Sequence, residues 1–275
     1  MSRNFDNRKR AFADAVTVEA WHDDFGSTKS CVDLHADVVF GIARVGGESE
    51  SPVRFRLSIK RAEVVVIIPD TEPVTVDKKS VSRDSPQLVG RLTKTMERKM
   101  KAGAKGKLSG SISPVYLGGS ITAEAHTEAG LSSSDRLSIS GAVRLMLVTQ
   151  SQTEDGHYRW LVTPQTKGFL EGRPWDPIKE PRLKLIDKRK NRQKGIPPTV
   201  RVEIRCRRED LVIDDLTLKD EGLWQSLKEK AGFRNKLAAA ESYIRDRLSE
   251  EGLEVRNISD IFGQVTLAST TAESG

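Results

Sequence analysis

The stretch 31–40, CVDLHADVVF, indicates the fold class most clearly. Apolar residues occupy every second position in its first part, and two aspartates and a histidine lie between them. This period of two is typical of a β-strand with one buried and one exposed face. The stretch 53–60, VRFRLSIK, alternates in the same way, with basic residues at exposed positions. We expect the two stretches to pair as an antiparallel hairpin.

The acidic face of the first stretch is the most distinctive cluster of potential ligands. Asp33, His35 and Asp37 would share one face of the strand, and carboxylate and imidazole groups can bind a metal or accept a proton. The facing strand would place the basic residues of 54–60 opposite them. Because opposite charges pair across a sheet and arginines repel a cation, we interpret this face as charge-paired surface and predict no metal site.

Further strands are predicted on both sides of this hairpin. The continuous run at 64–68 indicates a strand buried on both faces, and Asp155-Gly156 between two alternating runs is a strong hairpin signal. The remaining strands are expected at 74–76, 136–147, 158–162, 200–206, 211–216 and 265–267.

Two segments have the spacing of helices. At 85–101, Ser85 is a suitable N-cap and Pro86 suits the first helical position, and four apolar residues follow at intervals of four: Leu88, Leu92, Met96 and Met100. Nearer the C-terminus we expect a short helix to about Lys230, a break at Gly232 and a second helix that ends at Gly252. The apolar stripe of this second helix comprises Phe233, Leu237, Ala240, Ile244 and Leu248.

The sequence therefore predicts an α+β fold. The antiparallel β-rich body is sandwich or barrel-like, with an inserted basic helix and a helical C-terminal portion. The expected parts are a β-rich part at 1–84, a basic amphipathic helix and linker at 85–107, a second β-rich part at 108–216 with a flexible Gly/Ser segment at 108–135, a helical part at 217–264 and a disordered tail at 265–275.

Positive charge is concentrated in two segments. The chain has 45 basic and 39 acidic residues, but residues 86–107 hold seven basic residues and one acidic residue, and residues 181–208 hold eleven and two. Such segments suit a polyanion, and the low aromatic content (5%) favours contacts to a nucleic-acid backbone over base stacking. The predicted contact residues are Lys188, Arg189, Lys190, Arg192, Lys194, Arg201, Arg205 and Arg207, with help from Arg91, Lys94 and Arg98.

This distribution predicts a non-catalytic binding or assembly subunit that engages a polyanion. One alternative is a scaffold component that meets an acidic protein partner. A second is a membrane-active effector using residues 86–135, where apolar and small polar residues alternate beside the basic segment. Pro114, Glu124, His126 and Glu128 argue against this second alternative.

Several function classes lack their sequence signatures. No run of apolar residues is long enough for a membrane-spanning helix, and the N-terminus does not resemble a secretion signal. Gly103–Leu108 resembles a phosphate-binding loop but lacks its first glycine and its Ser/Thr. We expect no cofactor, no metal, no catalytic residue and a cytoplasmic protein with Cys31 and Cys206 reduced; a dispersed catalytic site and the oligomeric state stay open.

Overall fold

The computed structural model describes residues 8–25, 29–47, 53–83, 89–99, 134–144, 146–165, 168–189, 198–218, 229–253, 255 and 258–274. Antiparallel strands dominate these residues and one long helix accompanies them, so the predicted β-rich α+β class is confirmed. The chain forms two compact units, one of Met1–Leu88 with Met146–Gly275 and one of Val89–Leu145. The first unit is called the body and the second the hairpin unit.

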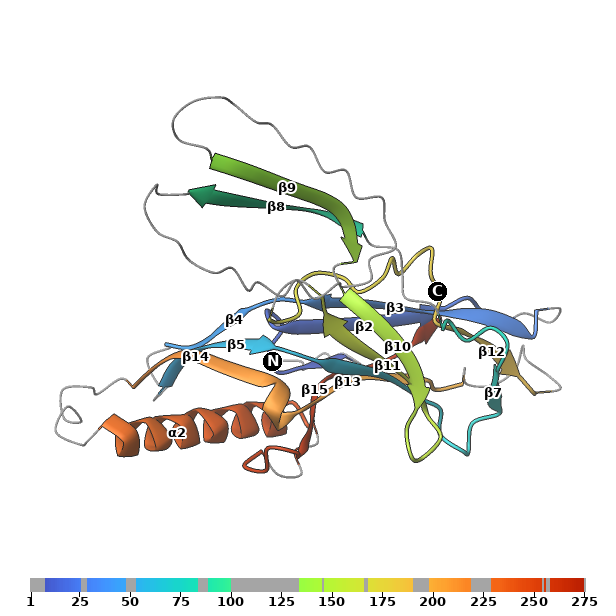
Figure 1. The fold of residues 1–275 in the computed structure, drawn as a ribbon. Coiled ribbons are helices and arrows are strands. Elements are labelled where there is room, and N and C mark those ends of the chain that lie inside the picture. Colours follow the sequence, from blue (N-terminus) through green and yellow to red (C-terminus); the bar gives the residue numbers. More distant parts are fainter. Residues whose placement is uncertain are drawn as a thin grey trace. The chain divides into compact units, whose positions relative to one another are not determined.

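Three sheets form the described part of the body (Figure 1). The largest contains, in order, β1 (Arg8–Arg10), β15 (Gln264–Thr271), β13 (Arg201–Arg207), β6 (Ala62–Ile67), β11 (Tyr158–Pro164) and β10 (Met146–Gln152). The second contains β16 (Glu273–Ser274), β2 (Val16–His22), β3 (Cys31–Phe40), β12 (Leu183–Asp187) and β7 (Val74–Asp77). The third contains β14 (Leu211–Leu218), β5 (Val53–Ile59) and β4 (Ala43–Gly46), and a short 3₁₀ turn, Arg208–Asp210, precedes β14.

The first two sheets pack face to face. Strand β2 lies against β13 and β15, and every second residue of β2 and β3 is buried. The apolar positions of the alternating sequence therefore form the core between the sheets, as the period of two predicts.

The helix α2 (Glu229–Glu250) covers the third sheet along β14 and β5 (Figure 1). Ala240, Ile244 and Leu248 are buried on its inner face, in agreement with the predicted stripe. Gly252 has φ +64° and ends the helix, and the N–H of Leu253 donates to the carbonyl of Leu248 at 2.9 Å.

Most predicted strands of the body are confirmed, but the first predicted hairpin is wrong. The Asp155-Gly156 turn joins β10 and β11, with Gly156 at φ +81°. Strand β3 instead pairs with β2 and β12, whereas β5 pairs with β4 and β14. The short strand β4 lies between β3 and β5 in sequence and takes the place beside β5. Alternation determines which face of a strand is buried, but it does not determine which strands pair with it.

The helix predicted at 85–101 is wrong as well. Residues Val89–Lys99 form strand β8, which pairs antiparallel with β9 (Ser134–Arg144). An interval of four residues fits one face of a helix, but it is also two periods of a strand, so Leu92 and Met96 share a face in either structure. The predicted contact residues Arg91, Lys94 and Arg98 therefore lie on a strand.

Two smaller corrections concern the C-terminal part. Gly232 lies inside α2 and does not separate two helices, because packing on the sheet outweighs the weak helix propensity of one glycine. The expected disordered tail is also wrong, since β15 and β16 extend to Ser274. Its small residues, such as Ala268 and Thr270, are buried within the large sheet. Residues 100–133 and 219–228 lie outside the described residues.

Candidate functional site

The predicted cations of β13 are ion-paired with acidic residues two positions away in the chain. Nε of Arg201 lies 2.9 Å from one carboxylate oxygen of Glu203, and Arg205 lies 2.8 Å from the other. Arg207 lies 3.7 Å from Glu209. Residues two apart on a strand share a face, so one buried glutamate serves both flanking arginines.

The predicted cations of 188–194 belong to a different sheet. Arg189 follows β12 and lies 2.6 Å from Asp187, and this hydrogen-bonded pair raises the pKa of the Arg189 guanidinium. Lys188 is exposed, and its backbone N–H donates to the Pro73 carbonyl at 2.8 Å. Lys190, Arg192 and Lys194 lie outside the described residues. In the described part of the chain, the predicted contact residues are thus divided between two sheets of the body and the hairpin unit.

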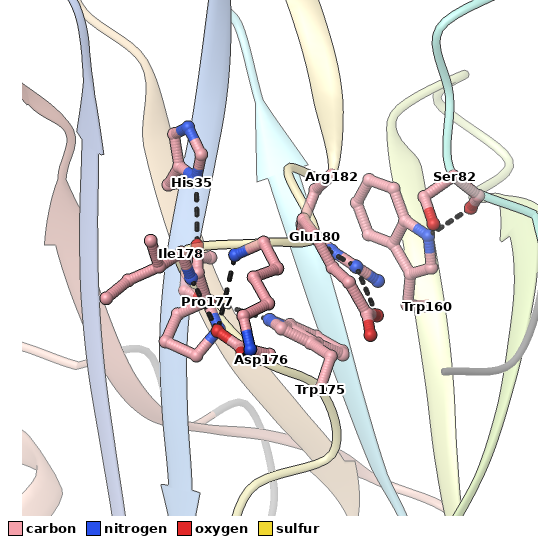
Figure 2. A network of polar contacts seen from close by, with 11 residues as sticks. His35, Ser82, Trp160, Trp175, Asp176, Pro177, Ile178, Glu180 and Arg182 are labelled. Carbon is pink, nitrogen blue, oxygen red and sulfur yellow. Dashed lines mark hydrogen bonds and ion pairs between the residues drawn. The ribbon is translucent and has the colours of Figure 1, made fainter. Parts of the chain in front are cut away.

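Arg182, which also belongs to the basic segment, is a core residue. Figure 2 shows it beside Trp175, and the guanidinium carbon lies 4.2 Å from the centre of the indole ring. Burial lowers the pKa of Arg182 to about 10, although the negative charge of Glu180 and the hydrogen bond to its carboxylate oppose that shift. This arginine holds the loop before β12 onto the sandwich and is not available to a partner.

The remaining contacts of this network are also structural (Figure 2). The indole N–H of Trp175 donates to the Ala36 carbonyl at 2.7 Å, and that of Trp160 donates to the Ser82 carbonyl at 2.8 Å. Nδ1 of His35 lies 2.8 Å from the Pro177 carbonyl oxygen. These bonds connect β3 and β11 with the loops before β12 and after β7.

The acidic face of β3 is charge-paired, as expected, but with other partners. Asp37 accepts two hydrogen bonds from Arg173, at 2.7 and 2.9 Å, and Asp33 lies 3.9 Å from Lys184 on β12. The expected partners at 54–60 lie in the third sheet. Within the described ranges, no three His, Cys, Asp or Glu side chains lie close enough together to hold a metal ion.

The hairpin unit consists, in its described residues, of two long paired strands. Strands β8 and β9 have eleven residues each and pair in continuous register from Val89↔Arg144 to Lys99↔Ser134. Two adjacent rows of the ladder join opposite charges, Glu97↔Arg136 and Arg98↔Asp135. Such cross-strand pairs favour this register over a shifted one.

The register places apolar and polar residues on opposite faces of this hairpin. Even-numbered positions of β8 share a face with odd-numbered positions of β9, because successive residues of a strand alternate between faces. That face holds Leu92, Met96, Leu137, Ile139 and Val143, with Gly90, Gly141, Lys94 and the terminal Arg98–Asp135 row. The opposite face holds Val89, Arg91, Thr93, Thr95, Glu97, Lys99, Ser134, Arg136, Ser138, Ser140, Ala142 and Arg144.

Sequence reasoning placed part of this hairpin correctly and missed its pairing. It assigned Leu137, Ile139, Val143, Leu145 and Leu147 to one face of a single strand. The first three share a face of β9, whereas Leu145 lies outside the described residues and Leu147 lies on β10. It did not join that strand to 89–99. The signal that could have found the pairing is the pair of complementary charge steps, Glu97-Arg98 and Asp135-Arg136.

Comparison with known proteins identifies no family. No family model and no curated protein match this chain. Among solved structures, the crystal structure of the Clostridium perfringens NetB toxin in the membrane inserted form matches 69% of this chain and 83% of its own. The identity is 8% and the TM-score 0.26. A TM-score this low establishes neither a common fold nor a common function.

In the described residues, no helix is both long enough and apolar enough to cross a membrane.

The two cysteines differ in accessibility. Cys206 is buried in β13, and burial raises the pKa of its thiol, whereas Cys31 is partly exposed at the start of β3. Cys31 is therefore the more reactive thiol.

Proposed function

We propose that the protein is membrane-active and that its β8–β9 hairpin is the part that enters a lipid bilayer. The observation that carries this proposal is the register of the hairpin, which places all its large apolar residues except Val89 on one face and its hydroxyl and most of its charged residues on the other. A strand with one face toward lipid and the other toward water requires this arrangement.

The dimensions of the hairpin suit the same role. A membrane-crossing strand needs about 9–11 residues, and both strands have eleven. Within the described residues, β8 and β9 pair only with each other, so each strand has one edge without a backbone partner. Lipid cannot form hydrogen bonds with the backbone N–H and C=O groups at these edges. Hairpins from several copies would therefore have to pair edge to edge when they enter the bilayer.

The sequence between the two strands also alternates, with apolar or small residues at positions of one parity (even or odd) and mostly polar residues at the other. After β8, apolar and small residues occupy even positions (Met100, Ala102, Ala104 and Leu108), and lysines occupy odd positions (Lys101, Lys105 and Lys107). Before β9 the apolar and small residues occupy odd positions, as they do in β9 itself. Leu117, Ile121, Ala125, Ala129 and Leu131 occupy odd positions, whereas Ser120, Thr122, Glu124, His126 and Glu128 occupy even ones. Glu124 and Glu128, which argue against a membrane role in the sequence analysis, therefore occupy the positions that alternate with the apolar and small residues.

Nucleic-acid binding through 182–208, a scaffold role and a cytoplasmic location stay predictions. The pairing of Arg201 and Arg205 with Glu203, and of Arg189 with Asp187, reduces the positive potential that these residues would offer a polyanion.

Release of a trapped dye from lipid vesicles tests the proposal with two matched variants. Leu137→Arg puts a cation on the apolar face, whereas Ser138→Arg puts the same cation on the neighbouring polar position. An arginine facing the bilayer centre costs about 2–4 kcal/mol, so we expect Leu137→Arg to release dye at least about tenfold more slowly than wild type and Ser138→Arg to stay near wild type.

The proposal is wrong if wild type releases no dye from vesicles of neutral or anionic phospholipid, or if both variants behave alike. An environment-sensitive fluorophore gives a second readout. In a Cys31→Ser background, a label at Leu137→Cys should shift to shorter wavelength on vesicle binding, whereas a label at Ser138→Cys should remain in water. The buried thiol of Cys206 should not take up the label.

A further inference from the structure

Three arginines outside the predicted basic segments converge on one pocket of the body. The pocket has a volume of about 460 Å³, and its lining comprises Arg44, Gly46, Gly47, Arg54, Phe55, Arg56 and Asp215. Arg44 lies on β4, and Arg54 and Arg56 lie on β5. All three arginines are exposed, while Val45, Phe55 and Leu57 between and beside them are buried.

The strand register brings these cations together. Arg44 lies directly opposite Arg56 across the β4–β5 ladder, and Gly46 lies opposite Arg54. Arg54 and Arg56 are two residues apart and so share a face. Like charges directly opposite each other in a sheet destabilise it, and a bound anion between them would remove that cost.

The charges of this pocket are mostly uncompensated within the described residues. Arg56 has two distant acidic neighbours, Asp214 at 3.9 Å and Asp215 at 3.6 Å. Neither Arg44 nor Arg54 has an ion pair in this part of the chain. Arg201 and Arg205 of β13, in contrast, each lie within 3 Å of the Glu203 carboxylate.

Gly47 gives the guanidinium of Arg54 its place. A Cβ at position 47 would lie 2.6 Å from Nε and 2.9 Å from Nη2 of Arg54, closer than non-bonded atoms approach. The φ of Gly47 is +93°, which residues with a side chain rarely adopt. The absence of a side chain at position 47 therefore leaves the space that the Arg54 guanidinium occupies.

We propose that this pocket binds a phosphate group, either on a lipid headgroup or on a soluble phosphorylated molecule. Guanidinium forks match the oxygen geometry of phosphate and bind it through two charge-assisted hydrogen bonds. Arg44 and Arg54 supply two forks that have no ion pair with another described residue, and Arg56 adds charge from the same face. The site does not depend on the membrane role of the hairpin, since every lining residue lies in the body.

Two binding measurements at low salt test the proposal and distinguish the two sources. Calorimetric titration with inorganic pyrophosphate and with glycerol 3-phosphate measures binding of soluble phosphate. Co-sedimentation with phosphatidylcholine vesicles, with and without phosphatidic acid, measures binding to a headgroup phosphate. Saturable binding in either arm supports the site and names its source.

Arg44→Gln/Arg54→Gln should weaken that binding at least about tenfold, since a hydrogen bond to a charged group contributes about 1.5–3 kcal/mol. Lys79→Gln/Lys179→Gln removes the same charge from exposed positions outside the pocket and should change binding by less than about twofold. Arg44→Lys/Arg54→Lys keeps the charge and the sheet but lacks the forks, and an intermediate loss is expected.

Three results would overturn the site: no saturable binding of either soluble probe or of the phosphatidic acid vesicles, equal losses in the Arg44→Gln/Arg54→Gln and control variants, or full binding by Arg44→Gln/Arg54→Gln. Because binding is measured in place of dye release, a failed phosphate site leaves the hairpin proposal standing, and the reverse also holds.

Discussion

Strand β3 of the body and strand β8 of the hairpin unit have the same kind of sequence but different surroundings. Strand β3 has apolar residues at alternate positions, and β8 has Leu92 and Met96 on one face with Lys94 between them. Strand β3 has neighbours on both sides, and its apolar positions, such as Leu34 and Val38, are at most 1% exposed. Strand β8 pairs in the described residues with β9 alone. A two-stranded ribbon is at best marginally stable in water, so the hairpin gains most from a surface that covers its apolar face.

The largest stability effect in this comparison is expected at the core of the body. Trp175→Ala would remove a buried indole, its hydrogen bond to Ala36 and its ring contact with Arg182. We expect the free energy of unfolding to fall by about 3–5 kcal/mol, measured by urea denaturation followed by far-UV circular dichroism. A loss below about 1 kcal/mol would show that this network does not hold the sandwich together.

A smaller effect is expected where the body neutralises its own cations. Glu203→Gln removes the carboxylate that both Arg201 and Arg205 contact, and it leaves the largely buried Arg205 without its charged partner. The free energy of unfolding should fall by about 1–3 kcal/mol. Glu250→Gln is the matched control, because its 3.3 Å contact with Arg247 is exposed, and unchanged stability in both variants would contradict this interpretation.

The smallest effect is expected in the hairpin unit. Met96→Ala removes a large apolar side chain from a ribbon that forms its own compact unit. The free energy of unfolding of the body, measured by urea denaturation, should change by less than about 0.5 kcal/mol. The same variant should reduce dye release from vesicles. A stability loss comparable with that of Trp175→Ala would instead show that the hairpin belongs to the core of the body.

The sequence predicted strands well and their partners poorly. Alternation at 31–40 and 200–206 gave the strands and their buried faces, because a period of two is a local property. It could not say that β2 and β12 flank β3, since a sheet position depends on residues far away in the chain. The interval between Leu92 and Met96 fits both a helix and a strand, and only the partner strand at 134–144 decides between them.

The arginines show the same limit for the candidate sites. The segment 182–208 is the most basic part of the sequence, yet Arg182 is buried against Trp175, and Arg201 and Arg205 are paired with Glu203. The pocket lies elsewhere because Arg44 reaches Arg56 only through the β4–β5 register. Charge density along a chain does not show which cations have acidic neighbours in space.

Strand β15 lies between β1 and β13, so the N-terminal strand reaches the large sheet only through residues made much later. During synthesis, the hairpin segment leaves the ribosome well before Gln264–Thr271 can complete that sheet. Contacts between such remote parts of a chain form slowly, because a long loop must close first. The edges of β1 and β13 that β15 joins therefore stay unpaired until Gln264–Thr271 has been made, and during this interval they can pair with strands of other chains.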